Sequence, residues 1–188
     1  IFKMKVEYFV GYDDVYAKWQ LNPETFWMES AEGIDWFKKP SRAFFEDENT
    51  SSWFKDSSVN CCWNAVDRHV EAGNGDLTAI LYDSPVTLTK RAISYSELQK
   101  KVALLAGGLR NKGIIAGDRV IIYMPMVPEA IEAMLACARL GAIHSVVFGG
   151  FASNELATRI NDAKPKAIIS GSFGIDRNKP VTKKANTA

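Results

Sequence analysis

The feature that most constrains the fold is a series of short apolar runs separated by segments of helical periodicity. The runs do not alternate polar with apolar residues, as a half-exposed strand does. Such runs are typical of strands that are buried on both faces of a mainly parallel sheet. The order β-α-β-α-β-α-β, with short connections, therefore predicts an α/β fold. The four runs are 79–82, 119–124, 143–148 and 167–171.

Capping and stop signals bound the helices between these runs. Ser94 and Glu97 form an S-x-x-E capping box, which satisfies free backbone donors at a helix start, and Gly113 follows as a stop. Pro128 begins the next helix and Gly141 ends it, with Ile131, Met134, Leu135 and Ala138 expected to face inward. Further helices are predicted from Asn60 to about Ala72, where Gly73 stops the helix, and from Ser153 to about Ala163.

The first third of the chain has a different character. All five Trp lie within the first 63 residues, and residues 1–60 carry 7 Lys+Arg against 11 Asp+Glu. Two short helices are predicted there, one from Asp13 to Trp19 and one after Asn22, which precedes Pro23 at the first helical position. We expect the aromatic side chains to pack as a core rather than to stack on a ligand. The sequence thus predicts an aromatic-rich N-terminal cap segment, residues 1–62, followed by an α/β body, residues 63–188.

Composition narrows the class of protein. Hydrophobic residues make up 47% of the 188 residues and charged residues 24%, which indicates a globular chain. The net charge of +1 gives no sign of a nucleic-acid or membrane partner. No apolar run approaches the roughly 20 residues that span a bilayer. No zinc-type spacing occurs, so we expect no metal site, and Cys61, Cys62 and Cys137 are interpreted as small core residues of a protein from a reducing, intracellular compartment.

Two loops that follow strands are candidate binding sites. Phe148-Gly149-Gly150-Phe151 stands between a strand and a helix, where glycines allow an anion to approach free backbone N–H groups. A tight strand-to-helix turn explains the same residues. Neither G-x-G-x-x-G nor a G-x-x-x-x-G-K-[ST] phosphate loop is present, which disfavours a dinucleotide oxidoreductase.

The second loop, Asp176-Arg177-Asn178-Lys179, follows the last predicted strand. It is either a solvated charged loop or a phosphate-binding patch with Arg177 and Lys179 as donors. The two histidines favour structural roles. His69 lies beside Asp67 in a helix, and His144 begins a predicted buried strand with no carboxylate or Cys next to it.

Longer motifs resemble a known family. The run Cys62-Trp63-Asn64-Ala65-Val66-Asp67-Arg68-His69 resembles the N-C-x-N-x-x-D-R-H element of AMP-forming acetyl- and propionyl-CoA synthetases. Residues 82–87 (YDSPVT), 122–130 (IYMPMVPEA) and 136–151 (ACARLGAIHSVVFGGF) are similar to the propionyl-CoA synthetase branch of short-chain acyl-CoA synthetases. The likeness covers roughly residues 10–176. It implies an N-terminal cap domain over residues 1–62 and an incomplete adenylate-forming, AMP-binding domain over residues 63–188.

The resemblance implies a ligase that joins propionate, or acetate, to coenzyme A at the expense of ATP, with AMP and pyrophosphate as products and Mg²⁺ beside the phosphates. The family's strand-end F-G-G element lies beside the bound CoA nucleotide, which carries over to Phe148, Gly149 and Gly150. The family's loop for the CoA 3′-phosphate carries over to Asp176, Arg177 and Lys179, although an acidic Asp176 would repel phosphate. No catalytic residue and no metal ligand carries over.

The family's T-S-G-T-T-G-x-P-K type ATP loop is missing from the sequence. We therefore expect a truncated piece that is inactive by itself and holds no cofactor tightly, from a protein of the mitochondrial matrix or cytoplasm. A stand-alone, non-catalytic module that binds the CoA nucleotide or a protein partner is the alternative. An in-frame segment that encodes the ATP loop just downstream would discriminate between the two.

Overall fold

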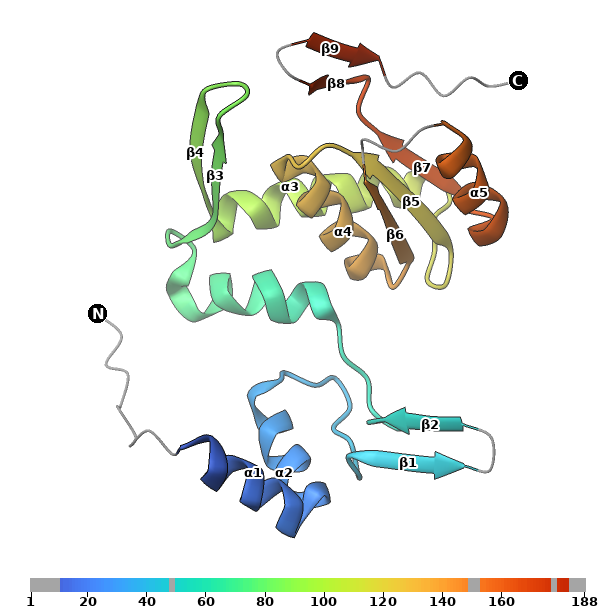
Figure 1. Ribbon diagram of the computed structural model, residues 1–188. Coiled ribbons are helices and arrows are strands. Elements are labelled where there is room, and N and C mark those ends of the chain that lie inside the picture. Colours follow the sequence, from blue (N-terminus) through green and yellow to red (C-terminus); the bar gives the residue numbers. More distant parts are fainter. Residues whose placement is uncertain (1–10, 48–49, 149–152, 177–178, 183–188) are drawn as a thin grey trace. The chain divides into compact units, whose positions relative to one another are not determined.

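Two units make up the chain in the computed structural model: unit 1, residues 1–59, and unit 2, residues 60–188 (Figure 1). For Phe148, residues 173–176 and residues 179–182 the description is confined to the backbone. The structure describes residues 11–47, 50–148, 153–176 and 179–182.

Unit 1 pairs two short helices with a β-hairpin. The Asn22 carboxamide oxygen accepts the Thr25 N–H at 3.0 Å, and Pro23 occupies the first turn, so the predicted cap is confirmed. The sequence also favours short strands or extended pieces at Ile34–Phe37 and Trp53–Phe54, and of these residues only Trp53 lies in a strand, at the end of β2. The elements are α1 (Tyr12–Leu21), α2 (Pro23–Ser30), the 3₁₀ turn η1 (Ala31–Gly33), β1 (Phe44–Asp47) and β2 (Thr50–Trp53).

The aromatic rings of unit 1 pack on one another without closing a core. Trp53 meets Trp27 at 5.3 Å and Phe44 at 5.0 Å between ring centroids, both edge to face. Trp53 is nevertheless 53% exposed, and Ala31 and Ala43 are the buried hydrophobic residues among the described part of this unit. The expected aromatic core is therefore an open cluster.

Unit 2 begins with the predicted helical segment. The Asn60 carboxamide oxygen accepts the Trp63 N–H at 3.0 Å, and Gly73, with φ of +82°, ends the regular turns. Cys62 is fully buried as expected, but Cys61 is exposed rather than a core residue, because neighbouring helix residues point about 100° apart. The segment contains η2 (Trp63–Asp67) and η3 (Val70–Asn74), both of π-helical geometry.

One expected strand lies outside the parallel sheet. β3 (Thr78–Ser84) pairs antiparallel with β4 (Thr89–Ser94), which the sequence did not predict. The connection of four residues explains the difference, because it is too short for a crossover between parallel strands. The hairpin leads into α3 (Tyr95–Asn111), where the Ser94 hydroxyl accepts the Glu97 N–H at 3.2 Å.

A three-stranded parallel sheet forms the centre of unit 2 (Figure 1). The strand order is β6-β5-β7, and three successive residues of β5, Val120, Ile121 and Ile122, are fully buried, as the apolar run predicts. The sheet and its helices are β5 (Arg119–Met124), α4 (Pro128–Leu140), β6 (Ile143–Phe148), α5 (Ser153–Ala163) and β7 (Ala167–Ser170).

Helices cover both faces of this sheet. Val120 belongs to a core cluster with residues of α3 and α4, whereas Ile121 packs with Leu156 and Ile160 of α5 on the other face. The inward face of α4 matches the prediction in part: Leu135 and Ala138 pack against the core, whereas Ile131 is 37% exposed and the fully buried positions are mostly small residues. Small side chains let α4 approach α3 closely. The buried small residues of α4 are Ala130, Ala133, Ala136 and Cys137.

The segment after β7 is not the loop that the sequence predicts. β8 (Phe173–Asp176) and β9 (Lys179–Thr182) form an antiparallel hairpin. Arg177 and Asn178, which follow β8 in the chain, lie outside the described residues.

Candidate functional site

The carboxyl edge of the parallel sheet is where a binding site is expected. The chain leaves β5 for α4 on one face and leaves β6 for α5 on the opposite face. A crevice opens between adjacent strands whose connections depart to opposite faces, and ligands of open α/β sheets bind in that crevice. The structure therefore has a topological switch point between β5 and β6.

The register of the two strands fixes where Phe148 lies. Met124 pairs with Phe148 at the last position of the parallel ladder, so the backbone of Phe148 stands at the switch point. Gly149 and Gly150 follow directly along the chain but lie outside the described residues. Of the predicted F-G-G element, the structure thus places the first residue at the expected edge.

The loop between β5 and α4 forms the other wall of this edge. Met126 is 85% exposed, and the Val127 N–H donates to the Pro125 carbonyl at 2.9 Å. Within the described part of the chain, no side chain caps the N-terminus of α4. Pro128 has no N–H and the Ala130 N–H donates to the Val127 carbonyl at 3.0 Å, so the Glu129 N–H is the first-turn donor left to face an anion. Residues 125–127 carry no ionisable side chain, so this loop can contact a ligand but cannot exchange protons with it.

The β8–β9 hairpin carries the second predicted group. Asp176 is the last residue of β8 and Lys179 the first of β9, and the two are partners in the antiparallel register. Arg177 lies between them, outside the described residues. The register therefore brings the backbones of Asp176 and Lys179 next to each other.

A buried ion pair that the sequence analysis missed holds the helices of unit 2 together. One terminal nitrogen of Arg139 lies 2.5 Å and 2.6 Å from the two Asp67 carboxylate oxygens. The Gln99 carboxamide also donates to this carboxylate, at 2.9 Å, and Asp67 is only 8% exposed. The network joins η2, α3 and α4, so it positions the helix that begins at the switch point. The signal in the sequence is a single Arg within the apolar run AMLACARL.

The remaining nucleophiles and histidines have structural surroundings. Burial raises the pKa of the Cys62 and Cys137 thiols, which keeps both in the unreactive protonated form. The His69 ring packs on Tyr95 at 4.8 Å between ring centroids. His144 is exposed on β6, not buried as predicted, because no described strand covers that edge of the sheet.

The described residues also limit other classes of site. Among them, no group of three or more His, Cys, Asp or Glu side chains could hold a metal ion. No helix in the described ranges has the length and apolar character needed to cross a membrane.

Fold and edge together define an α/β protein with a ligand crevice at the carboxyl ends of its parallel strands. Residues 66–188 match the family model described as AMP-binding enzyme, and residues 12–65 match the model described as acetyl-coenzyme A synthetase N-terminus. The chain belongs to the AMP-binding enzyme family, because the first of these matches covers more than half of it.

Individual relatives agree with this assignment. The chain is 53% identical, over 164 residues, to acyl-CoA synthetase short-chain family member 3, mitochondrial, of Rattus norvegicus; this covers 85% of the chain and 24% of the rat protein. It is 44% identical, over 182 residues, to acetyl-coenzyme A synthetase of Sinorhizobium medicae, covering 93% of the chain and 28% of that protein. The chain thus spans about a quarter of the length of these curated relatives.

Proposed function

We propose that this chain is the N-terminal part of an AMP-forming short-chain acyl-CoA ligase. The observation that carries the proposal is the match of residues 66–188 to the AMP-binding enzyme model, together with relatives named as acyl-CoA and acetyl-CoA synthetases. In the intact enzyme, a carboxylate oxygen attacks the α-phosphorus of ATP, and the bond to pyrophosphate breaks. The CoA thiol then attacks the acyl carbonyl of the acyl-adenylate, the carbon–oxygen bond to AMP breaks, and the thiol proton is lost.

In this proposal the chain contributes contacts to CoA. Phe148, Gly149 and Gly150 border the CoA nucleotide at the switch point, where the pairing of Met124 with Phe148 supports such a position. Lys179, aided by Arg177, binds the 3′-phosphate, and the hairpin register that sets Asp176 beside Lys179 makes Asp176 a source of repulsion. None of these residues takes a catalytic role.

The same proposal divides the chain into an N-terminal cap domain, residues 1–62, and the first part of the adenylate-forming domain, residues 63–188. Two observations bracket this border. The structural units divide between Val59 and Asn60, and the two family models meet between residues 65 and 66.

The groups that activate the acid are assigned to parts of the ligase beyond this chain, because the sequence has no ATP loop of the family type. Mg²⁺ would neutralise charge on the ATP phosphates in the intact enzyme, and we derive no step of this chain through the ion. The isolated chain is therefore proposed to be inactive.

Propionate is the proposed substrate, ahead of acetate. The support is the resemblance of residues 82–87, 122–130 and 136–151 to the propionyl-CoA synthetase branch. In the same direction, the identity to the short-chain acyl-CoA synthetase, 53%, exceeds the 44% and 48% to two acetyl-coenzyme A synthetases. The name of the rat relative also supports a mitochondrial location, with the cytoplasm as the alternative. Comparing kcat/KM of the intact ligase for the two acids tests the substrate, and equal values or a preference for acetate would overturn it.

Replacing Lys179 tests the CoA contact in the intact ligase. We expect Lys179→Ala to raise KM for CoA about tenfold, since one charge-assisted bond to phosphate is lost, and to leave KM for ATP unchanged. Dephospho-CoA lacks the 3′-phosphate, so the variant should use it as well as the unchanged enzyme does. Asp176→Asn should lower KM for CoA, because it removes a negative charge beside the phosphate.

Lys166→Ala is the matched control. The Lys166 ammonium binds Asp118 at 2.7 Å and the Gly113 carbonyl at 2.6 Å. The Lys166 backbone N–H donates to the carbonyl of Arg119, at the end of β5 opposite to the switch point. This substitution should leave KM for CoA unchanged. A Lys179→Ala enzyme that still distinguishes CoA from dephospho-CoA would exclude the proposed contact.

A further inference from the structure

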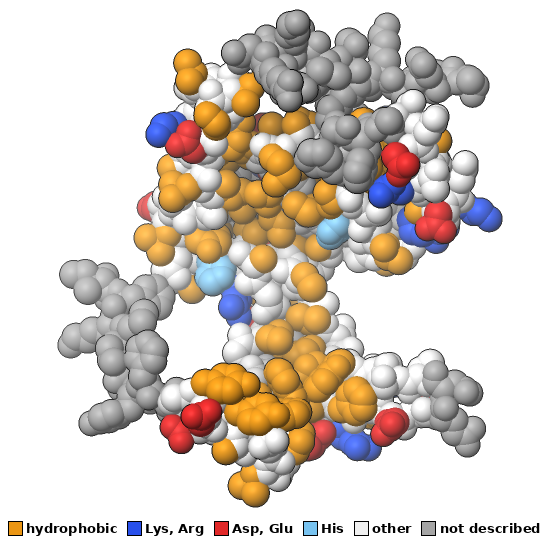
Figure 2. Space-filling view, viewed as in Figure 1, with side chains coloured by type: hydrophobic (Ala, Val, Ile, Leu, Met, Phe, Trp, Pro, Cys, Tyr) orange, Lys and Arg blue, Asp and Glu red, His pale blue; other side chains and the backbone are white. Residues whose placement is uncertain are grey.

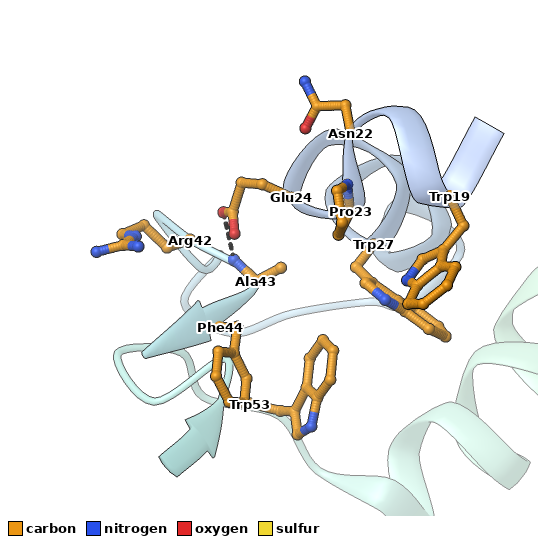
Figure 3. A pocket seen from close by; sticks show the side chains of 9 residues that line it. All are labelled: Trp19, Asn22, Pro23, Glu24, Trp27, Arg42, Ala43, Phe44 and Trp53. Atoms are coloured by element: carbon orange, nitrogen blue, oxygen red, sulfur yellow. Dashed lines mark hydrogen bonds between the residues drawn. The ribbon is translucent and has the colours of Figure 1, made fainter. Parts of the chain in front are cut away.

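Unit 1 contains a cavity of about 510 Å³ between its helices and its hairpin, within the size range of small-molecule sites (Figure 3). Trp19 comes from α1, Trp27 from α2, Phe44 from β1 and Trp53 from β2. The cavity is lined by Trp19, Asn22, Pro23, Glu24, Trp27, Arg42, Ala43, Phe44 and Trp53.

Aromatic rings dominate the wall. In Figure 3, the rings of Trp19 and Trp27 lie on the helical side of the cavity and those of Phe44 and Trp53 on the hairpin side. The edge-to-face contacts of Trp53 with Trp27 and with Phe44 hold these rings at angles of 72° and 60°. The faces of aromatic rings are electronegative, so rings inclined around one space attract a cation into it.

The polar residues of the wall are engaged elsewhere. The Glu24 carboxylate accepts the Ala43 N–H at 2.7 Å, and the Asn22 carboxamide oxygen accepts the Thr25 N–H. The Arg42 guanidinium lies 5.5 Å from the centre of the Phe45 ring and points away from the indoles in Figure 3. What faces the cavity is therefore ring surface, with one carboxylate at its margin.

Charge selects among the ligands that such a wall could take. Residues 1–60 carry 11 acidic and 7 basic side chains, so the field around the cavity favours cations over anions. A primary ammonium loses strong hydration when it enters an apolar space, whereas an alkylated ammonium is weakly hydrated and suits an aromatic wall.

We propose that this cavity binds a quaternary ammonium ligand, with its alkylated head group among Trp19, Trp27, Phe44 and Trp53. The cavity exceeds the size of a trimethylammonium group, which leaves room for an attached chain. The inference concerns unit 1 alone and does not depend on the proposed ligase function. It assigns a ligand class to a segment that the proposed reaction does not use.

A pair of isosteric probes tests the proposal on the 188-residue chain. Choline and 3,3-dimethylbutan-1-ol have nearly the same shape, and only choline is charged. Titration by calorimetry, with saturation-transfer NMR for weak binding, should show choline binding about tenfold more tightly than the alcohol. Equal affinity would reduce the cavity to an apolar pocket and overturn the proposal, and so would failure of choline to bind.

Variants of unit 1 locate the binding site. Trp53→Leu keeps an apolar side chain but removes a ring, and it should weaken choline binding about tenfold while barely changing the affinity of the alcohol. Trp27→Phe keeps a ring and should retain most of the affinity. Phe37→Leu is the control, because Phe37 is 67% exposed and does not line the cavity. Circular dichroism verifies that each variant is folded, and undiminished choline binding by a folded Trp53→Leu chain would exclude this site.

Discussion

Unit 1 and unit 2 pack their hydrophobic side chains in different ways. Unit 2 buries an aliphatic core in which Val102, Val120, Ile121 and Ile122 are fully inaccessible. Unit 1 relies on large rings that touch edge to face and leave Trp53 half exposed. Branched aliphatic chains fill the narrow space between a sheet and its helices, whereas bulky rings on short elements leave gaps between them.

The comparison teaches where each unit can bind. In unit 2, helices cover both faces of the described sheet, so its carboxyl edge is where a ligand is expected. Hydrophobic side chains also gather on the outer surface of that unit, over the elements α4 and β6, where Ile131, Ile143 and Val146 are exposed (Figure 2). In unit 1 the incomplete packing is itself a cavity.

The largest expected effect comes from breaking the buried ion pair of unit 2. Arg139→Met removes the cation that faces Asp67, whose side chain is 12% exposed, and leaves a buried charge uncompensated. We expect a loss of about 3–5 kcal/mol in the free energy of unfolding of unit 2. Urea denaturation followed by far-UV circular dichroism measures it.

A second substitution separates loss of the pair from loss of packing. Asp67→Leu combined with Arg139→Met removes both charges and should recover most of the stability. If the double variant is as unstable as the sum of the single variants, the two charges are not coupled and the network has been misassigned.

Truncating a buried side chain of unit 2 should cost far more stability than truncating an exposed ring of unit 1, and this difference should be almost as large as the effect of breaking the ion pair. Ile121→Ala in β5 removes a fully buried side chain and should cost about 2–5 kcal/mol. Phe37→Ala in unit 1 removes a ring that is 67% exposed and should change stability by about 0.5 kcal/mol or less. Equal losses, measured by urea denaturation, would contradict the contrast between a closed and an open core.

Two glycines of unit 2 should respond in opposite directions to the same change. Gly141 has φ of +70°, and an added Cβ would lie 3.2 Å from that of Ala116, so Gly141→Ala should cost about 1–2 kcal/mol. Gly107 lies exposed inside α3 with no described atom within 4 Å of an added Cβ. Gly107→Ala should therefore stabilise by about 0.5–1 kcal/mol. Thermal melts of the two variants should shift to opposite sides of the parent chain.

The smallest expected effect is a pH dependence in unit 2. Hydrogen bonding to the Lys166 ammonium lowers the pKa of Asp118 below its ordinary value. A lowered folded-state pKa means stability that is present above the unfolded pKa of about 3.9 and lost as pH falls through the folded pKa. Asp118→Asn should slightly lower the stability at neutral pH and leave it unchanged at low pH, where Asp118 is protonated, so the acid limb of the stability curve becomes flatter. An acid limb of unaltered slope would show that this exposed pair contributes nothing.

The same contrast explains how much could be predicted from the sequence. The run Arg119–Met124 and the helix Pro128–Leu140 have the predicted bounds, because periodicity and the stops at Pro125 and Gly141 are local signals. β4 and the β8–β9 hairpin were missed, because a short strand with polar residues is stabilised by its partner rather than by its own pattern.

Of the candidate site, the sequence placed Phe148 correctly at a strand end but could not show what stands beside it. Its pairing with Met124 depends on the order of the strands in the sheet. That order is set by which face of the sheet each connecting helix packs against, and no local pattern in the sequence gives it. The Asp67–Arg139 pair joins positions 72 residues apart, beyond the reach of any periodicity. The ring cavity of unit 1 likewise depends on the meeting of four separate elements.

The central claim is that this chain is the N-terminal, CoA-contacting part of an acyl-CoA ligase. Acyl-CoA formation by two proteins tests it most directly. One is the 188-residue chain alone; the other is the acetyl-coenzyme A synthetase of Sinorhizobium medicae with its matching N-terminal part replaced by this chain. With propionate or acetate, ATP, Mg²⁺ and CoA, we predict no release of AMP by the isolated chain and CoA-dependent release by the hybrid. Turnover by the chain alone, or a folded hybrid that forms the acyl-adenylate but cannot pass it to CoA, would contradict the account.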